Sequence, residues 1–345
     1  MKKTLKVILI IIAIFFCIGL IGTGIIYGLN SRNDKKYGKA DPTASTDVTD
    51  ISQYPTEIEG VAVEYVDNNT FQGFHLIPSD RQYKGVLICY GGSEGSPAFD
   101  VAQQYAEEGY ETLAVFMFGM KNQQKTLTKI PLEQFEDVLE YVKKNIEDNE
   151  PITIWAASKG SEYALYLATK YDEISNLILV APSAYSFSGF DFGNRGASWT
   201  WEGLEVPCVD IFKTPMAVTF KSMIFPMIAG APVSYKEIYD AALKADPQKD
   251  DKIIPAQDTK ANILLIAGED DQMWGSSDMA EIIKSKNSNA IILTYKDAGH
   301  VFKGNGVSNL PDMRMRLGGT EVGNKKAAEE SDKAISEFLK LHHIK

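Results

Sequence analysis

Three side chains suited to acyl-transfer chemistry each follow a strand-like run of the sequence. In chain order they are Ser158, Asp271 and His300. A serine hydroxyl is a weak nucleophile unless a histidine takes its proton and a carboxylate orients that histidine. The order serine, aspartate, histidine therefore predicts a triad in which Ser158 attacks a carbonyl carbon and forms an acyl-enzyme.

The residues around Ser158 resemble a nucleophile elbow, a sharp strand-to-helix turn written G-x-S-x-G. The sequence AASKG (156–160) has alanine in place of the first glycine. Small residues flank the serine in such turns because the turn brings it close to neighbouring backbone. The tripeptide alone carries little information, and its place between a buried strand and a helix gives it weight.

The acidic member of the triad has two candidates after the run 262–268. We choose Asp271, with Asp270 as the alternative, because a carboxylate here would orient the histidine. Either residue could instead be a loop carboxylate that caps the helix beginning near Ser276.

His300 is chosen among four histidines by its place after the last strand-like run. His75 belongs to an early hairpin, and His342 and His343 stand near the C-terminus, where we expect them to be solvated. Only His300 completes the order of the triad.

A glycine-rich stretch, GGSEG (91–95), follows another strand-like run and is the expected oxyanion hole. Glycines allow the backbone to approach a tetrahedral intermediate closely, so that N–H groups can stabilise its oxyanion. We expect the backbone N–H of Ser93 or Glu94 to be one donor and that of Lys159 the other. A phosphate loop is the alternative, but no G-K-[ST] follows.

Strand-like runs alternate with amphipathic stretches along the body of the chain, which predicts a mostly parallel sheet wrapped by helices. In such sheets the reactive groups collect at the carboxyl ends of the strands. The expected strands are 60–66 and 71–77, which form a hairpin, and 85–90, 111–118, 152–157, 176–182, 262–268 and 290–295. The expected helices are 97–109, 132–145, 159–171, 275–287 and 325–342.

Residues 183–258 interrupt this alternation and are predicted to be a helical insertion. They are rich in aromatic residues and methionines, among them Trp199, Trp201 and Met216. One interpretation is a set of extra helices that bury their own apolar face. We favour the other, a lid whose aromatic and methionine side chains line an acyl pocket.

The N-terminal residues 7–29 form a run of 23 amino acids without charge or proline, long enough to cross a bilayer as a helix. The alternative is a cleaved signal peptide, whose apolar run would be shorter. We expect a single-pass transmembrane anchor (1–30), a flexible linker (31–56), and a body (57–345) outside the cytosol. Cys89 and Cys208 of that body are expected to be free thiols.

The expected anchor is positively charged and the rest of the chain is negatively charged, which argues against nucleic acid as a partner. The chain carries a formal charge of −11, while residues 1–30 carry only three charges, all lysines, so the remainder has a charge of −14. A body this acidic is a poor nucleic-acid binder. No motif implies a metal or an organic cofactor.

Several stretches together resemble the C-terminal catalytic domain of the acyl-CoA thioesterase and bile acid-CoA:amino acid N-acyltransferase family. They are GGSEG (91–95), IPLEQFEDVLEYV (130–142), ASKGSEYAL (157–165), GEDDQMW (268–274), AGH (298–300) and LGGT (317–320). The resemblance covers about 85–340. It implies an α/β-hydrolase fold with Ser158 as nucleophile, Asp271 as acid and His300 as base.

Two departures from that family concern the substrate. The N-terminal β-sandwich domain of its full-length animal members is replaced here by the expected anchor and linker. An anchor would place the body outside the cytosol, where CoA thioesters are scarce.

The resulting hypothesis is a membrane-anchored serine hydrolase of small-molecule acyl esters or thioesters. Family members carry Cys or Ser at the nucleophile position, and Ser158 favours hydrolysis. One alternative is an acyltransferase that passes the acyl group to an amine or alcohol. Another is a non-catalytic binding module at the cell surface.

Overall fold

A computed structural model describes residues 2–39, 47–191 and 193–344; for residues 2–14, 17 and 18 it describes the backbone alone. Within these ranges the central sheet has nine strands in the order β1-β2-β3-β5-β4-β7-β8-β11-β12. In this order, each pair of adjacent strands from β5 to β12 is parallel. The pairs β1–β2, β2–β3 and β3–β5 are antiparallel. The strands are β1 (Glu57–Ile58), β2 (Val61–Asn68), β3 (Phe71–Pro78), β4 (Val86–Tyr90), β5 (Thr112–Val115), β7 (Ile152–Ala157), β8 (Ile174–Val180), β11 (Asn262–Gly268) and β12 (Ile291–Tyr295).

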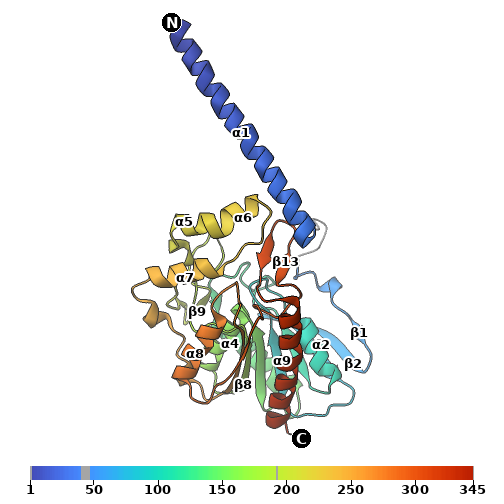
Figure 1. Ribbon diagram of the computed structural model, residues 1–345. Coiled ribbons are helices and arrows are strands. Elements are labelled where there is room, and N and C mark those ends of the chain that lie inside the picture. The colour runs from blue at the N-terminus through green and yellow to red at the C-terminus, as the bar shows by residue number, and fades with distance from the viewer. Residues whose placement is uncertain (1, 40–46, 192, 345) are drawn as a thin grey trace.

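Helices cover both faces of the sheet (Figure 1). One hydrophobic cluster joins the sheet to α3 (Phe135–Asn145), α4 (Lys159–Ala168) and α8 (Ser276–Lys286). A second cluster joins the opposite face to α2 (Phe99–Glu107) and α9 (Glu321–His342). The expected mostly parallel sheet wrapped by helices is therefore confirmed.

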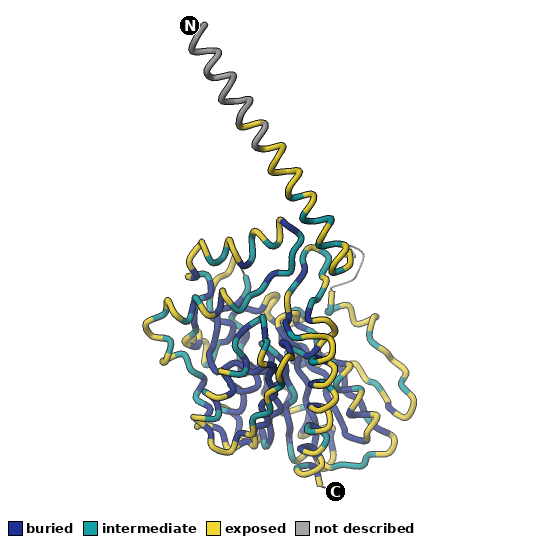
Figure 2. The backbone as a smooth tube through the Cα atoms, viewed as in Figure 1, coloured by how far each residue is buried: buried dark blue, intermediate teal, exposed yellow. Residues whose placement is uncertain are grey.

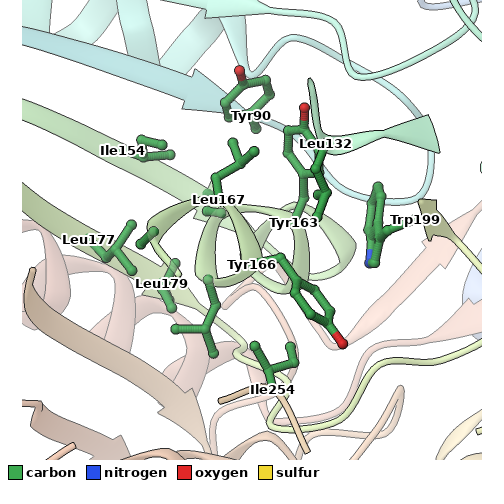
Figure 3. Close-up of a cluster of buried hydrophobic side chains, with 14 of the residues drawn as sticks. Tyr90, Leu132, Ile154, Tyr163, Tyr166, Leu167, Leu177, Leu179, Trp199 and Ile254 are labelled. Carbon is green, nitrogen blue, oxygen red and sulfur yellow. The ribbon is translucent and has the colours of Figure 1, made fainter. Parts of the chain in front are cut away.

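The central parallel strands are mostly apolar, because alternate residues point to opposite faces of the sheet and both faces are buried. Along β7, Ile152, Ile154 and Ala156 belong to the first cluster, whereas Trp155 and Ala157 contact the second. Figure 2 shows the strands buried at the centre of the body. Figure 3 shows α4 packed among side chains of that first cluster.

The insertion 183–258 contains more than helices. It holds α5 (Met216–Thr219), α6 (Phe225–Ile228) and α7 (Lys236–Ala245), and also β9 (Trp199–Trp201) and β10 (Leu204–Glu205). Strand β9 pairs with β10 and with β6 (Ile130–Pro131), which ties the insertion to the segment that leads into α3. A further hairpin of β13 (Val307–Asn309) and β14 (Arg314–Arg316) precedes α9.

Helix α1 (Lys2–Tyr37) projects from the body beside α6 and the β13–β14 hairpin (Figure 1). It extends into the expected linker. Its last turns are attached to the body, since Asn33 donates to the carbonyl of Ala229 at 2.8 Å. The buried Arg314 also binds Asp34 at 2.6 Å.

The expected transmembrane anchor finds no support in the structure. Among the residues whose side chains are described, no helix is both long and apolar enough to cross a membrane. The expected span 7–29 includes residues 7–14, 17 and 18, which lie outside that described set.

The end of the expected linker packs on the body. The Tyr54 ring lies 4.9 Å from that of Phe74 and 5.3 Å from that of Phe99, measured between centroids. Its hydroxyl donates to the carbonyl of Val48 at 2.8 Å. This segment therefore forms part of the surface near the start of α2.

The expectation that His343 is solvated is wrong. Its side chain is buried, with Nδ1 2.7 Å from the carbonyl of Lys84 and Nε2 2.7 Å from the hydroxyl of Thr153. A carbonyl only accepts, so Nδ1 donates and Nε2 accepts. Burial lowers the pKa of His343, which favours this neutral form.

Candidate active site

Ser158 stands at the turn between β7 and α4. Its backbone has φ 55° and ψ −123°, a conformation that costs energy for a non-glycine residue. A Cβ on Gly160 would collide with the carbonyl oxygen of Gly91, so this position requires glycine. The local sequence thus permits a tight elbow that holds Ser158 at the carboxyl end of β7.

Ser158, His300 and Asp271 form one hydrogen-bonded chain. The Nε2 atom of His300 lies 2.8 Å from Oγ of Ser158, and its Nδ1 atom lies 2.8 Å from Oδ2 of Asp271. An ionised carboxylate only accepts, so Nδ1 donates to it and Nε2 is left to accept from the serine hydroxyl. His300 and Asp271 are buried, which shields this chain from water.

The two neighbouring aspartates have different partners. Asp271 also accepts from the backbone N–H groups of Met273 (2.8 Å) and Trp274 (3.2 Å). Asp270 instead accepts from the N–H of Gly319 at 2.8 Å. Neither caps α8, whose N-cap residue is Gly275 and has no side-chain bond. Only Asp271 faces the histidine.

The loop 317–320 holds the acid and histidine loops together. The carbonyl of Leu317 accepts from the N–H groups of His300 (2.8 Å) and Gln272 (3.2 Å). Gly318 has φ +91°, and a Cβ on it would collide with the carbonyl oxygen of Asp270. This loop therefore fixes the separation of His300 and Asp271, a role that the sequence analysis did not identify.

Asn324 at the start of α9 is a second positioning residue that sequence reasoning missed. Its side chain is fully buried and accepts from the N–H of Gly299 at 2.8 Å. It donates to the carbonyls of Gly304 (3.0 Å) and Gly318 (3.2 Å). The only available signal was an asparagine four residues after Thr320, which is too common a feature to indicate this role.

The candidate oxyanion donors lie beside Ser158. In the loop between β4 and α2, a Cβ on Gly92 would stand 3.2 Å from the Cβ of Ser158. The carboxylate of Glu94 accepts from the N–H of Gly92 at 2.9 Å. Within the described ranges no acceptor occupies the backbone N–H of Ser93, Glu94 or Lys159. These three groups are therefore available to a ligand.

The Lys159 side chain forms a buried ion pair. Its Nζ lies 2.7 Å from Oε2 of Glu162, and both side chains are almost fully buried. The other oxygen of Glu162 accepts from Nε1 of Trp199 at 2.7 Å and from the N–H of Phe187 at 3.2 Å. Burial lowers the pKa of Lys159 and raises that of Glu162, while their mutual attraction opposes both changes.

Breaking this pair is expected to destabilise the protein severely. Glu162→Gln would leave the Lys159 ammonium buried without a counter-charge and should lower the free energy of unfolding by about 3–5 kcal/mol. The exposed pair of Glu140 and Lys144 provides the control, because Glu140→Gln should cost less than about 1 kcal/mol. Urea unfolding of both variants measures the difference, and equal losses would contradict this account of the pair.

A cavity of about 460 Å³ opens beside Ser158 and His300. Its apolar wall comes from the start of α2, from β7, and from the β13–β14 hairpin. The larger apolar side chains that line it are Tyr54, Phe99, Val101, Trp155, Met273, Val301, Leu310, Met315 and Leu317. Among the described residues, none of those lining this cavity belongs to 183–258.

The interpretation of the insertion as the lining of an acyl pocket therefore fails for this cavity. Trp199 is instead fully buried against α4, where its ring lies 5.0 Å from that of Tyr163. The bulky residues Met216, Phe220, Phe225 and Met227 are exposed on the surface.

The two described cysteines are poorly suited to act as nucleophiles, because a buried thiol with a raised pKa stays protonated. Cys89 and Cys208 are free thiols, as expected. Burial raises the pKa of Cys89, and it raises the pKa of Cys208 to about 11.

Across the described ranges, no group of three or more His, Cys, Asp or Glu side chains is arranged to hold a metal ion.

Solved structures with related folds include an esterase of Pyrococcus furiosus and an acylaminoacyl peptidase of Pyrococcus horikoshii. The esterase matches with a TM-score of 0.54 and 15% identity, over 84% of this chain and 95% of its own. The peptidase matches with a TM-score of 0.51 and 15% identity, over 84% of this chain and 43% of its own. With the strand order above, these similarities establish an α/β-hydrolase-like fold.

Sequence comparison shows similarity to acyl-CoA enzymes. The bile acid-CoA:amino acid N-acyltransferase of Mus musculus is 24% identical over 281 residues, which are 77% of this chain and 62% of that protein. Acyl-coenzyme A thioesterase 1 of Homo sapiens is 22% identical over 231 residues, 65% of this chain and 50% of that one. The chain thus spans less than two thirds of the length of these relatives.

A family model matches a long, continuous part of the chain. The model described as BAAT / Acyl-CoA thioester hydrolase C terminal matches residues 130–345. That range is well over half of the chain and includes Ser158, Asp271 and His300. The protein is therefore a member of the BAAT / acyl-CoA thioester hydrolase C-terminal family.

Proposed function

We propose that this protein is a serine hydrolase that cleaves an acyl ester or thioester through Ser158, His300 and Asp271. The observation that carries the proposal is the continuous hydrogen-bonded chain of these side chains beside an apolar cavity. Membership of a family that contains acyl-CoA thioester hydrolases supports the same class of reaction.

The reaction proceeds in two halves. As the Oγ atom of Ser158 attacks the carbonyl carbon, Nε2 of His300 accepts its proton and Asp271 stabilises the resulting imidazolium. The oxyanion receives hydrogen bonds from the N–H of Lys159 and of Ser93 or Glu94. His300 then protonates the departing alcohol or thiol. Water, activated in the same way, attacks the acyl-serine and releases the acid.

An acyltransferase is the second candidate, because relatives of this chain are named N-acyltransferases. The first half of the reaction would be unchanged, and an amine would replace water in the second. Turnover of an acyl thioester with and without glycine separates the two. Free acid as the only product supports hydrolysis, and N-acylglycine as the main product overturns it.

The non-catalytic binding module is the least supported alternative. A site without catalytic use has no need to retain a nucleophile, base and acid within hydrogen-bond distance of one another. Release of free thiol from an acyl thioester by the purified protein, lost in Ser158→Ala, would exclude it.

We also propose that residues 7–29 anchor the protein in a membrane, with the body outside the cytosol. The support is the absence of charge over 23 residues together with the preceding lysines. The full chain should stay in the membrane fraction after an alkaline wash, and a variant without residues 1–30 should be released. Release of the full chain by the wash would overturn the proposal.

A further inference from the structure

The charges that line the cavity are mostly negative. Glu94 and Asp100 contribute carboxylates, and Lys303 contributes an ammonium group. Among the described residues that line this cavity there is no arginine, the residue best suited to binding carboxylate or phosphate groups.

Glu94 is held close to the nucleophile. Its Oε1 atom accepts from the N–H of Gly92 at 2.9 Å and from the hydroxyl of Ser96 at 2.6 Å. Its Oε2 atom and the Cβ of Ser158 lie 2.8 and 3.2 Å from the point where a Cβ on Gly92 would stand. A fixed negative charge therefore stands beside the position of the scissile bond.

Aromatic rings share the cavity with these carboxylates. Tyr54, Phe99 and Trp155 line it, and the faces of such rings attract cations. Burial and the charges of Asp100 and Glu94 raise the pKa of Tyr54 to about 12. A carboxylate beside aromatic rings is an environment that stabilises a positive charge and repels a negative one.

We propose that the cavity selects acyl esters or thioesters by the charge next to the scissile bond, favouring a positive charge and rejecting a negative one. This inference rests on the proposed function. It concerns the charged group of the substrate that lies nearest to Glu94. The Glu94 carboxylate lies near Ser158 but is exposed to solvent, so the Coulomb interaction acts over a short distance and is screened by salt. An acyl compound with an amino-alcohol leaving group fits this environment, and one with a carboxylate on its leaving group does not.

Three thioesters with the same butyryl group test the proposal. Butyrylthiocholine carries a positive charge, S-butyryl-N-acetylcysteamine is neutral, and S-butyryl-3-mercaptopropionate carries a negative charge. Release of thiol measures kcat/KM for each. We expect kcat/KM to fall in that order, by about tenfold or more between the first and the last at low ionic strength. Added salt should reduce the span.

Two variants locate the source of the selection. Glu94→Gln keeps an oxygen that can accept from Gly92 and Ser96 but removes the charge, so the span should shrink to about threefold or less. Asp100→Asn should shrink it by a smaller factor, because Asp100 lies in the first turn of α2, whereas Glu94 is bound to the N–H of Gly92 beside Ser158. Glu281→Gln makes the same change of net charge on the exposed surface of α8 and should leave the span unchanged.

The outcomes separate this inference from the proposed function. Thiol release that depends on Ser158 but follows no charge order would overturn the inference alone. So would equal or faster cleavage of the mercaptopropionate thioester, or a span that survives in both Glu94→Gln and Asp100→Asn. Failure to cleave any of the three, together with an unreactive Ser158, would overturn the proposed function and this inference with it.

Discussion

Replacing Ser158 with alanine should lower kcat/KM for an acyl thioester by at least about 10⁴-fold. The variant has no oxygen at the end of the chain from Asp271 through His300, so no acyl-enzyme can form. Any residual rate would come from water attacking a carbonyl held by the oxyanion donors. Initial rates of thiol release, with the wild type at matched concentration, measure the loss.

The control for Ser158→Ala is another serine hydroxyl far from the cavity. Ser285 lies at the exposed end of α8, where its hydroxyl donates to the carbonyl of Ile282. Ser285→Ala should keep the wild-type rate within about twofold, and both variants should have the same circular dichroism spectrum. If Ser158→Ala keeps a tenth or more of the wild-type rate, Ser158 is not the nucleophile.

Asp271→Asn should have the next largest effect, a fall in kcat of about 10⁴-fold. An asparagine can present its N–H₂ group to Nδ1 of His300, which would place the ring proton on Nε2. His300 could then no longer accept from the Ser158 hydroxyl, and the imidazolium would also lose its counter-charge. Steady-state kinetics at several pH values measure the change in kcat.

Asp270→Asn is a matched control one residue away. Asp270 accepts from Gly319 and does not contact His300, so its loss should reduce kcat by less than about tenfold while lowering stability. A fall in kcat as large as that of Asp271→Asn would contradict the orienting role of Asp271.

The main strands of the sheet could be predicted because a strand buried on both faces is an almost continuous apolar run. The expected strand 152–157 is β7 itself, and 85–90 contains β4. Short strands such as β9 and β10 have only two or three residues, which is too few for any period to be visible. Their pairing with β6 depends on tertiary contacts.

The residues of the candidate site could be predicted from their positions along the chain. Ser158, Asp271 and His300 each follow a strand, and parallel strands bring such positions to one edge of the sheet. The positioning contacts of Leu317 use its backbone carbonyl, which any residue type has. The link between Asp34 and Arg314 joins residues far apart in sequence, and no local pattern indicates it.

The insertion shows where composition misleads. Its aromatic residues and methionines suggest an acyl pocket, yet Trp199 donates to Glu162 and helps to bury the ion pair that Lys159 and Glu162 form on α4. Hydrophobic composition indicates that a segment buries or presents apolar surface. It does not indicate which cavity that surface lines.

Reaction with a fluorophosphonate probe, followed by mass spectrometry of the labelled peptide, tests the central claim most directly. The probe phosphonylates a serine whose hydroxyl is activated by a neighbouring histidine. We expect one adduct per chain, located on Ser158, with no adduct in Ser158→Ala and much slower labelling in Asp271→Asn. An adduct on another residue, or undiminished labelling of Ser158→Ala, would contradict the assignment of Ser158 as the nucleophile.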